Sequence, residues 1–193
     1  MSEFDVSDEV LINQFKNGDI RSFNQIVIRY KDRLIHFIYG FVNDIDRAED
    51  LVQDTFMKLY THKDSYREIA KFSTWLYTIA GNLARTELRK LKRRKTYSIS
   101  SLSKDNNDFI IKDNDRGPSE FSNDKYLQNK VEKALSRLSA DFRTMIILRD
   151  IQELSYDDIS KIMDLPLGTV KSRINRGRLK LQNLIKNKEK LGD

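Results

Sequence analysis

The sequence contains no cysteine and only two histidines, His36 and His62, among its 193 residues. The absence of cysteine excludes disulfides, thiolate metal sites and cysteine nucleophiles, and two scattered histidines do not form a histidine-rich metal site. The sequence also lacks a phosphate-binding loop, a metal-ligand cluster and a nucleophile motif. We therefore predict no catalytic residue, no metal site and no cofactor, and we do not expect an enzyme.

Proline occurs twice and glycine seven times, so residues that interrupt helices are rare. No apolar run approaches the ~20 residues that are needed to span a bilayer. The N-terminal segment MSEFDVSDEV carries acids where a secretory signal would have a basic region followed by an apolar stretch. These absences predict a helix-rich, cytoplasmic protein that does not insert into a membrane.

Positive charge is concentrated in two short segments. Residues 85–95 carry a net charge of +6 and residues 168–188 carry +7, whereas the whole chain carries +6, so the remainder carries −7. Clustered cations on an otherwise acidic chain are typical of contact with a polyanion, because each neutralised phosphate releases condensed counterions. Two solvated helix faces would give the same pattern, and the charge runs alone do not decide between these interpretations.

Helical periodicity divides the chain into two blocks. Apolar residues recur at helical spacing in the first half of the sequence and again in its last third. Between the blocks, residues 96–125 are rich in serine, asparagine and aspartate and contain the breaker Gly117-Pro118. We predict an all-α fold of two small helical domains, 1–95 and 126–193, joined by a flexible linker.

The segment LSYDDISKIMDLPLGTVKSRINRGRLKL, residues 154–181, contains two predicted helices joined by a tight turn. Ser155 is expected to cap the first helix, with Asp158 near the third helical position, and residues 164–166 end it. The second helix starts near Gly168. One side of it is apolar and carries Val170, Ile174, Gly177 and Leu181.

The other side of the second helix carries hydroxyl, amide and cationic groups, which are Thr169, Lys171, Ser172, Arg173, Asn175, Arg176 and Arg178. This arrangement predicts a helix-turn-helix whose second helix enters the major groove of DNA. Arginine and lysine pair with guanine edges, asparagine with adenine, and serine or threonine with phosphates or bases. The alternative is a helical hairpin with a solvated basic face.

The same segment resembles the region-four domain of extracytoplasmic-function sigma factors, bacterial transcription initiation factors in which the pattern D-x-P-x-G-T-V-K-S-R opens the helix that reads the −35 promoter element. The resemblance implies groove contacts by five residues, Thr169, Lys171, Ser172, Asn175 and Arg176. It implies DNA-backbone contacts by Arg149, Arg173 and Arg178.

The N-terminal block resembles the promoter-melting domain of the same family. The stretch DRAEDLVQDTFMKLY, residues 46–60, is similar to the family's polymerase-binding helix. By itself, its polar face is typical of a solvated surface, but the apolar Met57 on that face favours a partner. The resemblance implies that Asp50, Gln53, Asp54 and Met57 dock on the clamp helices of the largest polymerase subunit.

The stretch FSTWLYTIAGNLARTELRKLKRR, residues 72–94, is similar to the family's −10 recognition helix. Its character changes from aromatic through polar to strongly basic, which suits unpaired bases at its start and duplex backbone at its end. We expect Trp75 to be a core residue. The implied −10 contacts are Tyr66 and Arg67, as the wall of a base-capturing loop, and Asn82, Arg85, Thr86, Arg89, Lys90, Arg93 and Arg94.

The resemblance implies a sigma factor that binds core RNA polymerase at the clamp helices and at the flap of the second-largest subunit, reads the −35 and −10 elements in double- and single-stranded promoter DNA, and helps to melt the promoter. The linker would thread the active-site channel, with Asp105, Asp108, Asp113 and Asp115 mimicking phosphates. An anti-sigma factor or another DNA-bound factor would control it. The main alternative is a helix-turn-helix regulator that binds operators as a dimer.

Overall fold

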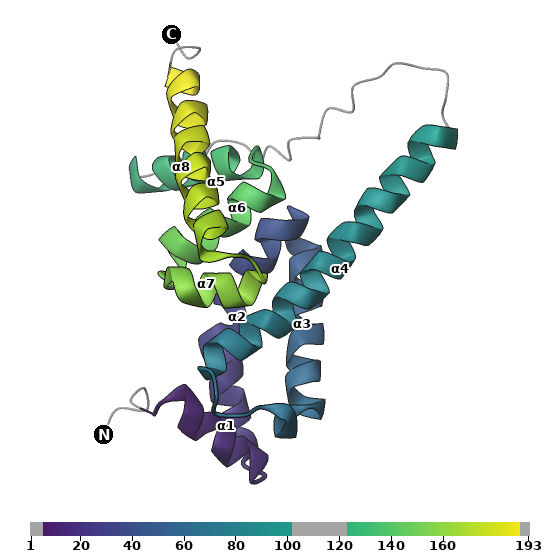
Figure 1. Cartoon of the computed structure of the whole chain (residues 1–193), viewed down its shortest axis with the longest axis vertical. Coiled ribbons are helices and arrows are strands. Elements are labelled where there is room, and N and C mark those ends of the chain that lie inside the picture. The colour runs from purple at the N-terminus through teal and green to yellow at the C-terminus, as the bar shows by residue number, and fades with distance from the viewer. Residues whose placement is uncertain (1–5, 102–122, 190–193) are drawn as a thin grey trace.

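The computed structural model describes residues 6–101 and 123–189, and every regular element in these residues is helical (Figure 1). The N-terminal domain, residues 6–101, holds four α-helices and one short 3₁₀ turn. The C-terminal domain, residues 123–189, holds four α-helices and one π-helical turn. The elements are α1 (Asp8–Lys16), α2 (Ile20–Val42), α3 (Ile45–Thr61), η1 (Lys63–Ser65), α4 (Phe72–Ser101), α5 (Asn123–Ser136), α6 (Ala140–Ile146), η2 (Ile147–Ile151), α7 (Tyr156–Met163) and α8 (Leu167–Glu189).

Short polar side chains start the first three helices. Ser7, Asp19 and Asp44 each accept a hydrogen bond from a first-turn backbone N–H, at 3.3, 2.9 and 3.1 Å, which satisfies a donor that has no partner inside the helix. Asn43 ends α2 with a φ of 55°, a left-handed conformation that asparagine tolerates better than most residues. These caps mark where α1, α2 and α3 begin and where α2 ends.

The core of the N-terminal domain is rich in aromatic rings. The ring of Phe37 lies 5.1 Å from that of Tyr77, and Tyr30 lies 5.9 Å from Phe72, both edge to face. Burial raises the pKa of Tyr77 to about 12. Rings on α2 thus meet rings at the start of α4, and this packing holds the predicted −10 helix against the domain.

The C-terminal domain is built around the pair α7 and α8. Ile159 and Ile162 of α7 and Val170 and Ile174 of α8 are fully buried. A second small cluster joins Leu135 of α5 to α6 and α8. Both domains therefore have the helical cores that the periodicity predicted.

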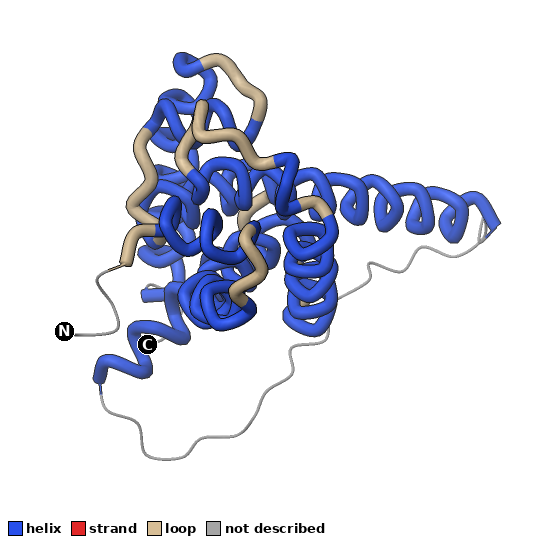
Figure 2. Tube along the Cα trace, turned by 90° about the horizontal axis from the view of Figure 1, so that it is seen from below, coloured by secondary structure: helices blue, strands red, loops and turns tan. Residues whose placement is uncertain are grey.

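The two domains pack directly on each other. Helix α6 lies against α2, and α7 lies against α4 (Figure 1). Met145 and Leu148 of the C-terminal domain belong to the same apolar cluster as the N-terminal core. Figure 2 shows that the far half of α4 projects beyond this packed body. The sequence predicted two domains, and the structure adds an extensive contact between them.

Both ends of the segment predicted as the linker, 96–125, are helical. Helix α4 continues to Ser101, and α5 begins at Asn123. The acidic residues that were expected to mimic phosphates in the polymerase channel, Asp105, Asp108, Asp113 and Asp115, lie outside the described residues.

Candidate nucleic-acid interface

The helix-turn-helix of the C-terminal domain has the predicted local geometry. The Ser155 hydroxyl accepts a hydrogen bond from the Asp158 backbone N–H at 3.1 Å, and α7 ends at Asp164, whose φ is 54°. The Ser160 hydroxyl donates to the Leu165 carbonyl at 2.5 Å and holds the turn. Helix α8 then begins at Leu167. The predicted cap, turn and helix start are all confirmed.

The predicted groove residues on the outward face of α8 differ in their exposure to solvent. Lys171, Asn175 and Arg176 are exposed, whereas Thr169 and Ser172 are half-buried and joined by a 3.0 Å hydrogen bond from the Ser172 hydroxyl to the Thr169 carbonyl. Because Val170 and Ile174 anchor the opposite side of the helix, this face has a fixed orientation. The face combines cations, amides and hydroxyls, which are the groups that read DNA edges and phosphates.

The cations that flank this face are held by neighbouring side chains. The Arg149 guanidinium lies 4.7 Å from the centroid of the Tyr156 ring, and the Lys171 ammonium lies 5.9 Å from the same centroid. Arg173 lies 3.8 Å from Asp141, and Arg178 forms a forked ion pair with Asp150. Contacts with neighbouring side chains therefore hold four of the predicted −35 residues in place, which are Arg149, Lys171, Arg173 and Arg178.

The polar part of α4 is organised by a chain of hydrogen bonds. Arg85 Nη2 donates to Asn82 Oδ1 at 2.7 Å, and the Thr86 hydroxyl donates to the Asn82 carbonyl at 2.8 Å. Arg89 Nη2 lies 3.3 Å from the Thr86 hydroxyl. Arg85 also donates from Nη1 to the Ile162 carbonyl of the C-terminal domain at 3.3 Å. Burial there lowers the pKa of Arg85 below its usual range.

The last four predicted −10 residues along α4 are exposed cations. They are Arg89, Lys90, Arg93 and Arg94. Lys90 lies 3.6 Å from Glu87. The exposed cations form a positive strip that suits phosphate contact.

The loop between α3 and α4 corrects one expectation. Tyr66, predicted to form the wall of a base-capturing loop, is only 1% exposed. Its ring packs against Phe72 and Trp75, and its hydroxyl donates to the Ala70 carbonyl at 3.0 Å. The ring therefore presents no free stacking face and instead fixes the loop. Ile69 of this loop is 93% exposed. The predicted Arg67 is exposed as well.

The predicted polymerase-binding residues lie along one exposed side of α3. They are Asp50, Gln53, Asp54 and Met57. The other side of the helix buries Ala48, Val52 and Leu59. Met57 is 63% exposed, which is unusual for a large apolar side chain on a polar face. The structure thus places all four residues on a surface that a partner can reach.

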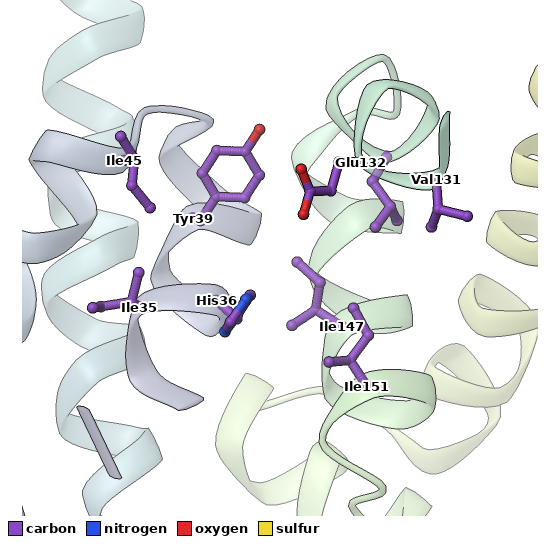
Figure 3. A pocket seen from close by; sticks show the side chains of 9 residues that line it. Ile35, His36, Tyr39, Ile45, Val131, Glu132, Ile147 and Ile151 are labelled. Carbon is purple, nitrogen blue, oxygen red and sulfur yellow. The ribbon is translucent and has the colours of Figure 1, made fainter. Parts of the chain in front are cut away.

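A cleft of about 890 Å³ lies between the two domains (Figure 3). Ile35, His36, Tyr39 and Ile45 line it from the N-terminal domain, and Val131, Glu132, Leu135, Ile147 and Ile151 line it from the C-terminal domain. Three of these aliphatic side chains, Ile45, Val131 and Ile151, are exposed. The cleft is therefore mostly apolar, although it is open to solvent. This cleft could not be predicted from the sequence, because its lining comes from segments far apart in the chain.

Comparison with known protein families identifies the family of this chain. The model of Sigma-70 region 2 matches residues 26–94, and the model of Sigma-70 region 4 matches residues 128–181. The chain is 34% identical to the ECF RNA polymerase sigma factor SigW of Bacillus subtilis over 91% of this chain and 95% of the relative. This chain belongs to the extracytoplasmic-function (ECF) sigma factors.

Other relatives agree with this family. The ECF RNA polymerase sigma-E factor of Escherichia coli K12 is 35% identical over 96% of this chain and 97% of its own length. Among solved structures, the sigma factor RpoE in complex with the anti-sigma factor NepR from Bartonella quintana is 31% identical, with a TM-score of 0.61 over 86% of this chain and 98% of that one. A structure of CnrH in complex with the cytosolic domain of CnrY has the same fold, with a TM-score of 0.66 at 24% identity over 94% of this chain and 99% of that one.

As an ECF sigma factor, the chain binds core RNA polymerase, directs it to promoters and is not an enzyme. The family that the two sequence motifs indicated is thus confirmed. Among the described residues, no helix is both long enough and apolar enough to span a membrane.

Proposed function

We propose that this sigma factor divides promoter recognition among three separate surfaces. The outward face of α8 reads the −35 duplex, with Thr169, Lys171, Ser172, Asn175 and Arg176 in the groove and Arg149, Arg173 and Arg178 on phosphates. The observation that carries the proposal is the character of this face. The face carries many cations and hydrogen-bonding groups, and residues 168–188 contain no acidic residue. The buried side chains of Val170 and Ile174 fix the orientation of the face.

The second surface takes the −10 element. The exposed loop residues Arg67 and Ile69 meet an unpaired base, the polar groups of Asn82, Arg85 and Thr86 contact neighbouring bases, and the cationic strip of α4 holds phosphates. Tyr66 acts as a positioning residue, because its buried ring and its hydrogen bond to Ala70 set the shape of the loop. Strand opening is then driven by binding energy, which offsets the few kcal/mol that unstacking a base costs.

The third surface is the exposed stripe of α3, which docks on the clamp helices of the largest polymerase subunit, while the C-terminal domain meets the flap of the second-largest subunit. Acidic and amide groups around the exposed Met57 give this stripe both charge and an apolar contact. Polymerase binding at α3 leaves the outward faces of α4 and α8 for DNA.

Run-off transcription tests the whole proposal. Core polymerase is incubated with the full-length protein and genomic templates, and the transcript start sites are mapped. New start sites that share sequences near −10 and −35 are expected. Their absence at saturating protein, or a stable dimer that binds operators without polymerase, contradicts the proposed function.

We also propose that a protein of the anti-sigma class inserts an apolar helix into the cleft between the domains. The similar RpoE structure holds an anti-sigma factor, and the exposed aliphatic side chains of Ile45, Val131 and Ile151 offer a surface of the matching character. A protein that copurifies with the wild-type chain from its native cells should inhibit run-off transcription by the wild type. It should not inhibit the double variant Ile45→Glu, Ile151→Glu. Equal inhibition of both contradicts this binding site.

A further inference from the structure

Three polar side chains share one face of α1. Glu9, Asn13 and Lys16 follow one another at spacings of four and three residues, which places them on the same side of a helix. Leu11 and Phe15, on another side, are buried in the core of the N-terminal domain and fix the rotation of the helix. Helix α1 lies against η1 and α4 (Figure 1). The polar face of α1 therefore has a fixed place beside the segment that joins these two elements.

Two of these side chains bind the loop between η1 and α4, residues 66–71. Lys16 Nζ donates to the Tyr66 carbonyl at 2.7 Å, and the same ammonium lies 5.2 Å from the centroid of the Tyr66 ring. One turn earlier, Asn13 Nδ2 donates to Glu68 Oε1 at 2.5 Å. Helix α1 thus holds the loop at its first residue and again two residues later.

The third side chain of this face caps α4. The backbone N–H of Phe72, the first residue of α4, donates to Glu9 Oε1 at 3.3 Å. The first N–H groups of a helix have no partner inside it, and Lys71, which precedes α4, has no acceptor in its side chain. A carboxylate at this end also suits the helix dipole. Glu9 therefore supplies from α1 the cap that the local sequence of α4 lacks.

A second lysine makes the reverse contact. Lys63 Nζ of η1 donates to the Phe15 carbonyl at 3.0 Å and lies 4.6 Å from the centroid of the Phe15 ring. This carbonyl belongs to the last turn of α1, where the negative end of the helix dipole favours a cation. Lys16 and Lys63 thus join the end of α1 to the segment before α4 in both directions.

The exposed residues of the loop lie between the points that α1 holds. Arg67 follows Tyr66, and Ile69 follows Glu68, so each exposed side chain comes directly after a residue in contact with α1. The match to the Sigma-70 region 2 model begins at residue 26, so α1 lies outside the matched segment. The contacts of α1 are therefore a feature of this chain that the family match does not describe.

We propose that α1 is a positioning element of the −10 site, in which Glu9, Asn13 and Lys16 set the path of the loop and thereby its base preference, without touching a base. The inference rests on the proposed function, because it takes the loop as the part that meets an unpaired base. Ordering a flexible segment costs conformational entropy, and a segment already held in its binding conformation avoids this cost. Releasing the loop should therefore weaken its discrimination between bases.

Substitutions on α1 test this role in the full-length protein. Lys16→Met removes the ammonium but keeps an apolar stem, and Asn13→Ala removes a solvent-exposed hydrogen bond, so this second variant should fold normally. Lys16→Arg can still donate to the Tyr66 carbonyl and is the conservative variant. Lys31→Met, at an exposed position of α2, is the matched control for the loss of one positive charge. The measurements are hydrogen exchange of residues 66–72, denaturant unfolding, and run-off transcription with core polymerase on a library of −10 sequences.

We expect faster exchange of residues 66–72 in Lys16→Met and Asn13→Ala. In the same two variants, the ratio of transcript yields between the best and the worst −10 base should fall severalfold. Lys16→Arg and Lys31→Met should keep the exchange and the ratio of the unsubstituted protein. A general loss of stability would lower the yield on every template by the same factor and leave the ratio unchanged. Unchanged exchange in both variants overturns the holding of the loop by α1, and faster exchange with an unchanged ratio overturns its role in base preference.

A failure of the proposed function gives different results. If the unsubstituted protein yields no run-off transcripts, or if Ile69→Ser leaves the −10 preference unchanged, the proposed −10 surface fails, whatever the exchange of the loop. If Ile69→Ser changes the preference while Lys16→Met and Asn13→Ala keep the ratio of the unsubstituted protein, only the positioning role of α1 fails.

Discussion

Arg178 of α8 and Asp150 of η2 form a forked ion pair, in which Arg178 Nε lies 3.1 Å from Asp150 Oδ2 and Nη2 donates to Oδ1. The hydrogen bonds that Arg178 donates to the Asp150 carboxylate raise the pKa of Arg178 above its usual range. The pair holds a cation beside the recognition face, but it also neutralises a charge that a DNA phosphate would otherwise attract. Asp150 and a phosphate therefore compete for the same guanidinium.

Replacing Asp150 with asparagine should therefore tighten binding to the −35 duplex. Releasing one surface cation from an exposed partner is expected to raise affinity by about two- to fivefold at low salt, and the gain should shrink as salt is added. Fluorescence anisotropy with the mapped −35 sequence measures it. The double variant Asp150→Asn, Arg178→Ala is the control and should lose the gain. An equal gain in the double variant would mean that Asp150 repels DNA without acting through Arg178.

Arg176 should contribute sequence preference rather than general affinity. It is exposed on α8 and has no ion pair or hydrogen bond within the described part of the chain. If it pairs with a guanine edge, Arg176→Ala should weaken binding to the preferred duplex by about tenfold and should affect a scrambled duplex much less. Lys186→Ala, farther along the same helix, is the control. A uniform loss across both sequences would assign Arg176 to a phosphate.

Much of the fold could be predicted from local patterns. The cap at Ser155, the turn after Asp164 and the buried stripe of Val170 and Ile174 depend on neighbours within one or two helical turns. The exposed stripe of α3 likewise follows from its periodicity. These features need only the identity of adjacent residues, and the structure has them as expected.

The contact between Gly40 of α2 and Arg143 of α6, in which Arg143 Nε donates to the Gly40 carbonyl at 2.9 Å, could not be predicted in the same way. From the sequence alone, Gly40 is a mildly unfavourable residue inside a helix and Arg143 is an ordinary surface cation. Their contact joins residues that lie about a hundred positions apart in the chain. The burial of Tyr66 could not be predicted for a related reason. An aromatic ring in a polar loop suggests an exposed stacking group, but its burial depends on Phe72 and Trp75 in the next helix.

The stripe of α3 should be needed for polymerase binding but not for folding. Replacing Met57 with aspartate removes an exposed apolar contact, and Asp54→Lys inverts a charge on the same surface. Each should weaken binding to core polymerase by about tenfold or more, as expected for groups near the centre of an interface. The melting temperature should stay within a few degrees. Asp32→Lys on α2 is a control for the charge change, and an equal loss there would remove the special role of α3.

Two substitutions in the loop between α3 and α4 should have different effects, one on the −10 base preference and the other on the stability of the loop. Ile69→Ser alters an exposed side chain and should leave the free energy of unfolding unchanged within about 0.5 kcal/mol, while it changes which −10 sequences support transcription. Tyr66→Phe removes a buried hydrogen bond to Ala70 and should cost about 1 kcal/mol of stability. Run-off transcription on a library of −10 sequences and denaturant unfolding measure the two effects. An unchanged −10 preference in Ile69→Ser would place base capture elsewhere.

The contact between α7 and α4 should weaken in acid through Asp158, whose carboxylate lies 3.4 Å from the Lys71 ammonium and 3.2 Å from the Thr74 hydroxyl. Burial by itself raises the pKa of this carboxyl, but hydrogen bonds from Ser155, Lys71 and Thr74 together with the charge of Lys71 outweigh it, and the pKa lies below its ordinary value of 3.8. A carboxyl whose pKa is lowered by folding contributes stability that is fully present above its unfolded pKa and is lost as the pH falls through the folded pKa.

Asp158→Asn should therefore be less stable than the wild type at neutral pH, and the difference should shrink as the pH falls below 3.8. Lys71→Met, which removes the charged partner, should reproduce part of the effect. Denaturant unfolding of the three proteins between about pH 3 and pH 7 measures the difference. A difference that stays constant or grows on acidification would mean that the Asp158 carboxylate does not stabilise the folded protein through its contacts with α4.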